Sequence, residues 1–308
     1  MSDHRPKHNW TKHDGALIFV ILFGLTSVVA LSHWIDSHRP AADPNVEEEK
    51  AYLSGNTVKR ISLGFNGLVA DWYWMRSLQY VGRKIINPHE HIRLDNLGQL
   101  NLKLLAPLLD AATTLDPEFM EPYEYAAVVL PDVDVQEAIR ITRKGIAANP
   151  SAWRLYQHLG YIYWQQHDFE AASKTYGEGA KLPGVPVWML GLHARMAAEG
   201  GSLATAREIY QRMYEGAGDP SVKEMARLRL LQVESFAERT IIRRTLADYA
   251  TRTKRCASSW KDVSASLRAA GLRLDGSGIP LDPSDTPYQL VQGGCDVDLD
   301  FHSQVPYR

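Results

Sequence analysis

Two small groups of residues in this 308-residue chain are of types that could bind a metal or form a covalent link. His89 and His91 flank Glu90, but side chains two positions apart point to different sides of a helix, so only a loop would let them bind a metal weakly. Cys256 and Cys295 are the only cysteines, too few for a four-ligand zinc site. We therefore predict neither a metal site nor a cofactor.

Sequence motifs that would indicate catalysis are absent. The chain contains no GxGxxG, P-loop, GxSxG or HExxH pattern, so we predict that it is not an enzyme. Its 45% apolar content is ordinary for a folded protein. A formal net charge of −2 argues against a general nucleic-acid-binding protein, which would carry a basic excess. Binding to other proteins is the remaining class.

Residues 15–35 form a run of twenty-one residues without Asp, Glu, Lys or Arg. A helix of that length spans about 30 Å, the thickness of the hydrocarbon layer of a bilayer, so the run predicts a transmembrane helix. Arg5, Lys7 and Lys12 precede it in the tail 1–14, which indicates that the N-terminus lies in the cytoplasm and the bulk of the chain outside.

Two other interpretations of this run stay open. Val28, Val29 and Ala30 fit the small-residue pattern before a signal-peptidase cut, so the segment could be a cleaved signal peptide. It could also be a buried core helix. An acidic linker over 36–57 follows it and leads to the body of the chain.

The body of the chain repeats with a period of 34 residues. Small residues recur in two columns, at Ala126, Gly160 and Ala194 and at Ala138, Ala172 and Ala206. Thr142, Tyr176 and Tyr210 form a third. This period is typical of tetratricopeptide repeats, pairs of antiparallel helices that stack on their neighbours. Small residues let two helices approach closely, and prolines stand between the units. We predict an all-α tetratricopeptide-type solenoid over 58–254, with 221–254 as its closing pair of helices.

The stretch VADWYWMRSLQY, residues 69–80, lies near the start of this region, before its clearly periodic units, and is rich in aromatics. Apolar residues recur in it at three- and four-residue steps, which predicts an amphipathic helix. The leading interpretation is that it packs on the helix of residues 104–117. Alternatives are a docking surface for a partner or the nearby bilayer, or a cofactor pocket.

After residue 254 the composition changes, and residues 255–308 predict a small C-terminal module with a helix and a hairpin. Strands are expected at 288–291 and 297–299, joined through Gly293 and Gly294. The segment PLDPSDTPY, residues 280–288, resembles the P-x-DP-x-G-x-PY pattern of bacterial pseudopilins, with Asp285 where that pattern has Gly.

Together with ADWYWMRSLQY near the start, this tail resembles a group of membrane-anchored bacterial tetratricopeptide-repeat proteins over nearly the full chain. The resemblance implies an inner-membrane protein crossing the membrane once, with its repeats in the periplasm. The bilayer through residues 15–35 is then one partner. The group is known mainly as a repeat fold, so it implies architecture more than function.

Proteins of this repeat family bind partners in a concave groove lined by the first helix of each pair. Eight residues occupy the family's groove positions in this chain, namely Met120, Tyr123, Arg154, Gln157, Tyr161, Trp164, Trp188 and Arg195. The set mixes aromatics with two arginines and contains no acid, which suits a peptide with apolar and acidic groups. Alternatively several of them, Trp164 and Trp188 especially, are buried against the next repeat.

The two cysteines bracket the C-terminal module. In an oxidising compartment an even pair tends to form a disulfide, so we predict a Cys256–Cys295 bridge; two separate buried thiols are the alternative. The function that these features predict is a membrane-anchored extracytoplasmic scaffold for protein–protein interactions in a secretion, pilus or envelope assembly. The alternative is an integral accessory subunit of a membrane enzyme or transport complex.

Overall fold

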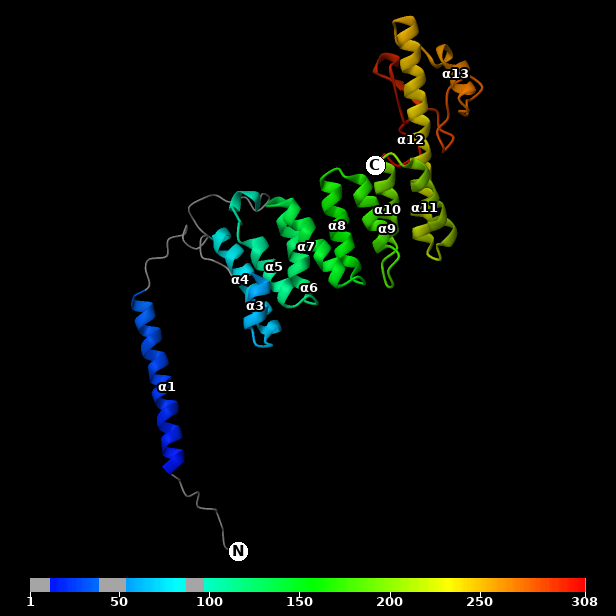
Figure 1. Cartoon of the computed structure of the whole chain (residues 1–308). Coiled ribbons are helices and arrows are strands. Elements are labelled where there is room, and N and C mark those ends of the chain that lie inside the picture. Colours follow the sequence, from blue (N-terminus) through cyan, green and yellow to red (C-terminus); the bar gives the residue numbers. More distant parts are fainter. Residues whose placement is uncertain (1–11, 39–53, 87–96, 308) are drawn as a thin grey trace. The chain divides into compact units, whose positions relative to one another are not determined.

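The computed structural model describes residues 12–38, 54–86 and 97–307, and the chain divides into two units, Met1–Tyr52 and Leu53–Arg308. Most of the described residues are helical, which confirms the all-α class. Figure 1 shows the succession of helices along the chain. His89 and His91 lie outside the described residues.

The first unit contains α1 (Lys12–Ser37). The large apolar side chains described in this helix are exposed, from Phe19 at 69% to Ile35 at 45%. Among the described residues, however, no helix has both the length and the apolar character that crossing a membrane requires. The transmembrane helix predicted over 15–35 is therefore not found in this part of the chain.

The second unit begins with α3 (Gly55–Ile61) and α4 (Asn66–Ile86), which both pack against α5 (Leu105–Leu115). A short turn of 3₁₀ helix, η1 (Leu97–Leu100), precedes α5. One face of α4 is buried, and its buried residues are Ala70, Tyr73, Ser77, Tyr80 and Val81. The packing of α4 on α5 is the arrangement that the leading interpretation of residues 69–80 predicts.

Six further helices follow, and each packs against the next along the chain. They are α6 (Met120–Val129), α7 (Val135–Ala148), α8 (Trp153–Gln165), α9 (Phe169–Gly179), α10 (Trp188–Glu199) and α11 (Leu203–Gly216). A 3₁₀ turn, η2 (Leu130–Asp132), joins α6 to α7. The side chains of Asp134 and Asp168 accept hydrogen bonds from the first free N–H groups of α7 and α9, so they fix where these helices begin.

The two predicted columns of small residues are buried throughout these helices, and all five of their alanines are fully buried. Gly160 shows why size matters there, since a Cβ atom at this position would lie 2.7 Å from the ring of Tyr176. The close contact between α8 and α9 thus requires a glycine, which has no side chain, at position 160. Packing of small residues against large ones positions the helices that carry the candidate site.

The chain continues into α12 (Pro220–Thr253), one uninterrupted helix of 34 residues. The closing pair of helices expected over 221–254 is therefore wrong. The physical reason lies in the sequence, which has neither Gly nor Pro after Pro220 until the helix ends at Lys254 in a left-handed conformation.

The C-terminal module packs on α12. It contains η3 (Trp260–Asp262), α13 (Ser264–Ala269), β1 (Gln289–Val291), η4 (Gln292–Gly294) and β2 (Asp296–Asp298). The strands pair antiparallel with Leu290 opposite Val297, within a residue of the predicted hairpin. Ile242 and Leu246 of α12 belong to the same buried cluster as the apolar residues of the module. The module has no separate core, because it shares one with this helix.

Candidate functional site

An open groove of about 610 Å³ crosses alternate helices of the second unit. Its walls come mainly from α6, α8 and α10, and Val128, Tyr161 and Trp164 supply large apolar surfaces. Val128 is 61% exposed and Tyr161 is 47% exposed, while Trp164 is half-buried beside Tyr161 with ring centroids 5.4 Å apart. A concave surface that leaves large apolar side chains exposed has the shape and chemistry of a binding site.

A polar cluster fixes the far wall of the groove. The Nε atom of Arg195 donates to Oε1 of Glu199 at 2.8 Å, one helical turn away on α10. Trp164 donates from its indole N–H to the other carboxylate oxygen of Glu199 at 3.3 Å. The guanidinium of Arg195 also lies 5.9 Å from the centroid of the Trp164 ring. These contacts hold the aromatic ring and the charge in fixed positions.

A second hollow of about 830 Å³ adjoins the first, since Arg195 lines both. It lies among α10, α11 and α12, where Arg229 donates to Oε1 of Gln232 at 2.6 Å. Gln232 in turn donates to the carbonyl oxygen of Pro306 at 3.3 Å. The residues that line the two hollows come mainly from the helices α6 and α8 to α12.

Four of the eight predicted groove residues line the first hollow, namely Gln157, Tyr161, Trp164 and Arg195. Arg154 and Trp188 gather instead around Trp153, with the guanidinium 5.0 Å from the Trp153 ring centroid and the Trp188 ring 5.7 Å from it. They form a separate aromatic cluster outside both hollows.

Tyr123 and Met120 are not groove residues. Tyr123 is fully buried, and its hydroxyl donates to the carbonyl oxygen of Thr113 at 3.3 Å. Burial raises the pKa of Tyr123 to about 12. Met120 is half-buried and packs against the same core cluster. The reason is their place on α6, where both side chains meet core rather than the hollow.

Several groove residues were not predicted from the sequence, chiefly His158, Glu199 and Asp132. Burial lowers the pKa of His158; the charge of Glu124 opposes this and that of Arg154 adds to it, so the imidazole is neutral at pH 7. The groove is therefore not free of acids, as the predicted set was. The four-residue spacing of Arg195 and Glu199 on one helix is the sequence signal that could have identified this ion pair.

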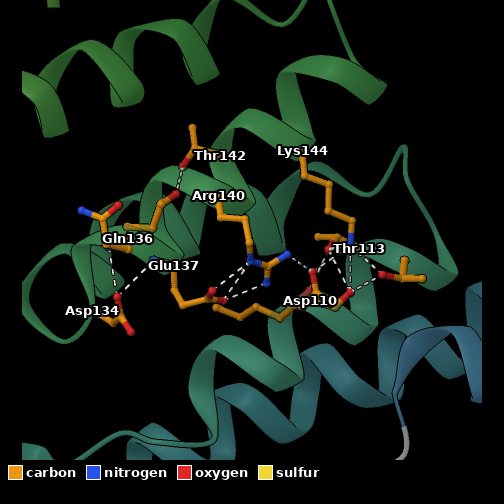
Figure 2. Close-up of polar contacts among 11 residues, drawn as sticks. Asp110, Thr113, Asp134, Gln136, Glu137, Arg140, Thr142 and Lys144 are labelled. Carbon is orange, nitrogen blue, oxygen red and sulfur yellow. Dashed lines mark hydrogen bonds and ion pairs between the residues drawn. The ribbon is translucent and has the colours of Figure 1, made fainter. Parts of the chain in front are cut away.

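A polar network outside both hollows links α5 to α7, as Figure 2 shows. Asp110 accepts hydrogen bonds from Arg140 at 2.9 Å and from Lys144 at 3.0 Å. Burial would raise the pKa of Asp110, but the hydrogen bonds and charges of these two bases lower it overall. Lys144 also donates to Thr113 Oγ1 at 3.0 Å. Asp110, Arg140 and Lys144 all have hydrogen-bond partners within the network. We therefore interpret the network as a structural link between the two helices and not as a reactive site.

The two cysteines lie together in the C-terminal module. The Cα atoms of Cys256 and Cys295 are 5.0 Å apart, and the structure joins their sulfur atoms in a disulfide. In the described parts of the chain, no three His, Cys, Asp or Glu side chains are grouped so that they could hold a metal ion.

No protein-family model matches this chain, and no curated protein matches it significantly.

Proposed function

We propose that this protein is a tetratricopeptide-type scaffold that binds a segment of a partner protein in the groove between α6 and α12. The observation that carries the proposal is that the groove exposes the apolar side chains of Val128 and Tyr161. Beside them, Arg195 forms an ion pair with Glu199. Aromatic and Arg side chains are the usual anchors of interfaces between proteins.

The groove favours a partner segment with a large apolar side chain flanked by polar backbone. Val128 and Tyr161 offer apolar contact, and Gln157 and Gln165 on the same walls offer amide groups to a peptide backbone. The side chain of Arg195 is 52% exposed, and its terminal N–H groups can donate to an acidic group of the partner while its Nε atom still donates to Glu199. A segment with apolar and acidic residues would satisfy all of these groups.

The repeat assignment and the location are parts of the same proposal. The period of 34 residues, the buried columns of small residues and the packing of each helix on the next support the repeat assignment. Exposed apolar side chains along α1 support a role for this helix in attachment to a bacterial inner membrane, with the groove on the extracytoplasmic side. Such a protein would organise the components of a membrane or envelope assembly.

Quantitative capture by the full-length chain tests this function. Tyr161→Ala and Trp164→Ala, alone and together, are compared with Trp188→Ala, which removes an aromatic side chain of similar exposure outside the groove. We expect the groove variants to weaken capture of the same partner about 30-fold or more, the effect of losing an interface anchor. Trp188→Ala should leave capture unchanged.

Circular dichroism and thermal melting accompany the capture assay. Groove variants that keep their helical content and still capture the partner at full strength would contradict the proposal. A single partner that copurifies in fixed ratio and cannot be exchanged would instead assign the chain as an integral subunit of a membrane complex.

A further inference from the structure

The outer face of α4 exposes a second group of large apolar side chains, at the opposite end of the helix succession from α12. Leu63 is 87% exposed and Phe65 is 67% exposed in the turn that joins α3 to α4. Along α4 the same face continues with Leu68, Trp72 and Met75, which are 69%, 54% and 52% exposed. Their three- and four-residue spacing places these three on one stripe of the helix. We name these five residues the outer face.

Charge on this part of the chain is strongly basic. Residues 55–86 contain five basic side chains and one acid, Asp71, although the whole chain has a formal net charge of −2. Lys59 and Arg60 lie in the last turn of α3, directly before the turn that carries Leu63. The guanidinium of Arg76 lies 5.5 Å from the centroid of the Trp72 ring, beside the apolar stripe. Apolar and aromatic side chains bordered by basic ones are typical of surfaces that lie on anionic lipid.

The rest of α4 has a different role, so the outer face is not needed for folding. The opposite side of the helix, with Tyr73, Ser77 and Tyr80, is buried against the core. Trp74 packs edge-on against Phe119 and Tyr125, with ring centroids 6.2 and 5.3 Å away. One sequence thus divides its aromatics between a buried side and an exposed one.

We propose that the outer face lies on an anionic membrane surface, with Leu63, Phe65 and Trp72 at the level of the lipid headgroups. The inference rests on the proposed membrane attachment through α1. Seventeen residues, 38–54, separate the end of α1 from the start of α3, and they reach at most about 60 Å when extended. Attachment at α1 therefore keeps the outer face close enough to a bilayer to bind it repeatedly.

Fluorescence quenching of the full-length chain on vesicles tests the contact. A polarity-sensitive dye is attached at Gln79→Cys, an exposed position on the same stripe of α4, or at Gln211→Cys, an exposed position on α11. Vesicles of phosphatidylglycerol and phosphatidylcholine carry brominated acyl chains as the quencher. We expect roughly threefold stronger quenching at position 79 than at 211, reduced when Trp72→Ser and Leu68→Ser are added. Raising the salt concentration should weaken it, because salt screens basic groups from anionic lipid.

Flotation of the same samples separates this inference from the attachment on which it rests. Salt-resistant flotation with equal quenching at both positions would leave the attachment intact and overturn the outer-face contact. Flotation at low salt only, with quenching at position 79, would support the contact and contradict the attachment through α1. A chain that does not float under any condition would overturn both the attachment through α1 and the outer-face contact. If the outer face instead binds a second copy of the chain, the protein should form dimers that the Trp72→Ser variant does not form.

Discussion

The helix succession from α5 to α11 and the C-terminal module on α12 are held together in different ways. In the helices, the buried apolar side chains form three clusters that follow one another along the chain, and the polar contacts between α5 and α7 are half-exposed. In the module, one buried apolar cluster is shared with α12, and it is supplemented by a disulfide and by the buried polar groups of Asp282 and Tyr288. We therefore expect many side chains to share the stabilisation of the helices, so that exposed groove residues can be substituted without unfolding them. In the module, we expect single substitutions to have large effects on the free energy of unfolding.

Asp282 illustrates the concentrated case. This residue is 1% exposed, and its Oδ1 atom accepts hydrogen bonds from the backbone N–H groups of Ser284 at 2.7 Å and Thr286 at 2.9 Å. The hydroxyl of Ser303 donates to Oδ2. One carboxylate thereby fixes the loop before β1 and joins it to the C-terminal residues.

The largest effect that this comparison predicts comes from the disulfide. Replacing Cys256 and Cys295 together by Ser opens a loop with a sequence separation of 39, which should lower the unfolding free energy of the module by about 4 kcal/mol in the chain-entropy account. Because the chain has eight tryptophans, its fluorescence does not isolate the module, so hydrogen–deuterium exchange of the segment around the buried Trp260 follows this unfolding during a urea titration. Equal stability of the double variant and the oxidised parent would show that the bridge does not hold the module.

A glycine in the helices should give the next largest effect. Gly160→Ala places a Cβ atom against the Tyr176 ring, and overpacking of this kind costs about 1–3 kcal/mol. The matched control is Gly82→Ala in α4, where nothing lies within 4 Å of the new Cβ atom. The control should gain about 0.5–1 kcal/mol from helix propensity alone. A lower melting temperature for Gly160→Ala together with a higher one for Gly82→Ala would support close packing of α8 on α9. A higher melting temperature for both variants would contradict it.

Removing one hydroxyl tests the buried hydrogen bonds between α12 and the module. The Tyr288 hydroxyl donates to Oε2 of Glu238 at 2.9 Å and lies 3.0 Å from Oγ of Ser235, and Tyr288 is 2% exposed. Tyr288→Phe leaves a partly buried carboxylate without this donor, which should cost about 1–3 kcal/mol in urea unfolding. The control is Tyr307→Phe, in which an exposed tyrosine loses one hydrogen bond to the carbonyl oxygen of Leu299, and a cost no larger than that of this control would weaken the comparison.

Glu238 should make the same contact sensitive to pH. Burial raises the pKa of Glu238 above its ordinary value of 4.5, although the Tyr288 hydrogen bond opposes the change. The folded protein then binds a proton more readily than the unfolded chain, so stability is greater at low pH and is lost as pH rises from 4.5 through the raised pKa. Glu238→Gln should remove this dependence and keep an acceptor for Tyr288.

Much of the helical architecture could be predicted because its determinants are local or periodic. Asp134 and Asp168 cap the helices that they precede, and the columns of small residues through Ala126 and Ala138 recur every 34 residues and are buried. The uninterrupted helix α12 was predicted less well. The alternation of basic and apolar residues over 221–254 indicates a helix but does not indicate whether the segment forms one long helix or two shorter ones.

The groove was predicted only in part, for a physical reason. Periodicity assigns a residue to a face of its helix but does not say which side chains meet across helices. Tyr123 occupies a groove position by period and is nevertheless buried, while Arg154 turns to Trp153 and away from the hollow.

In the C-terminal module, Asp285 stands where the pseudopilin pattern has Gly. It nevertheless adopts the left-handed backbone conformation that this pattern requires of its glycine, with φ at 61°.

Site-specific photo-crosslinking at position 161 tests groove binding most directly. A photoreactive phenylalanine analogue replaces Tyr161 in the full-length chain in cells. A second version carries it at position 212 in place of Arg212, an exposed residue of α11 on a different side of the helix from Leu203 and Tyr210, which line the second hollow. Binding in the groove predicts a discrete adduct with one partner protein at position 161 and none at position 212. The same adducts at both positions, or no adduct at 161, would contradict it.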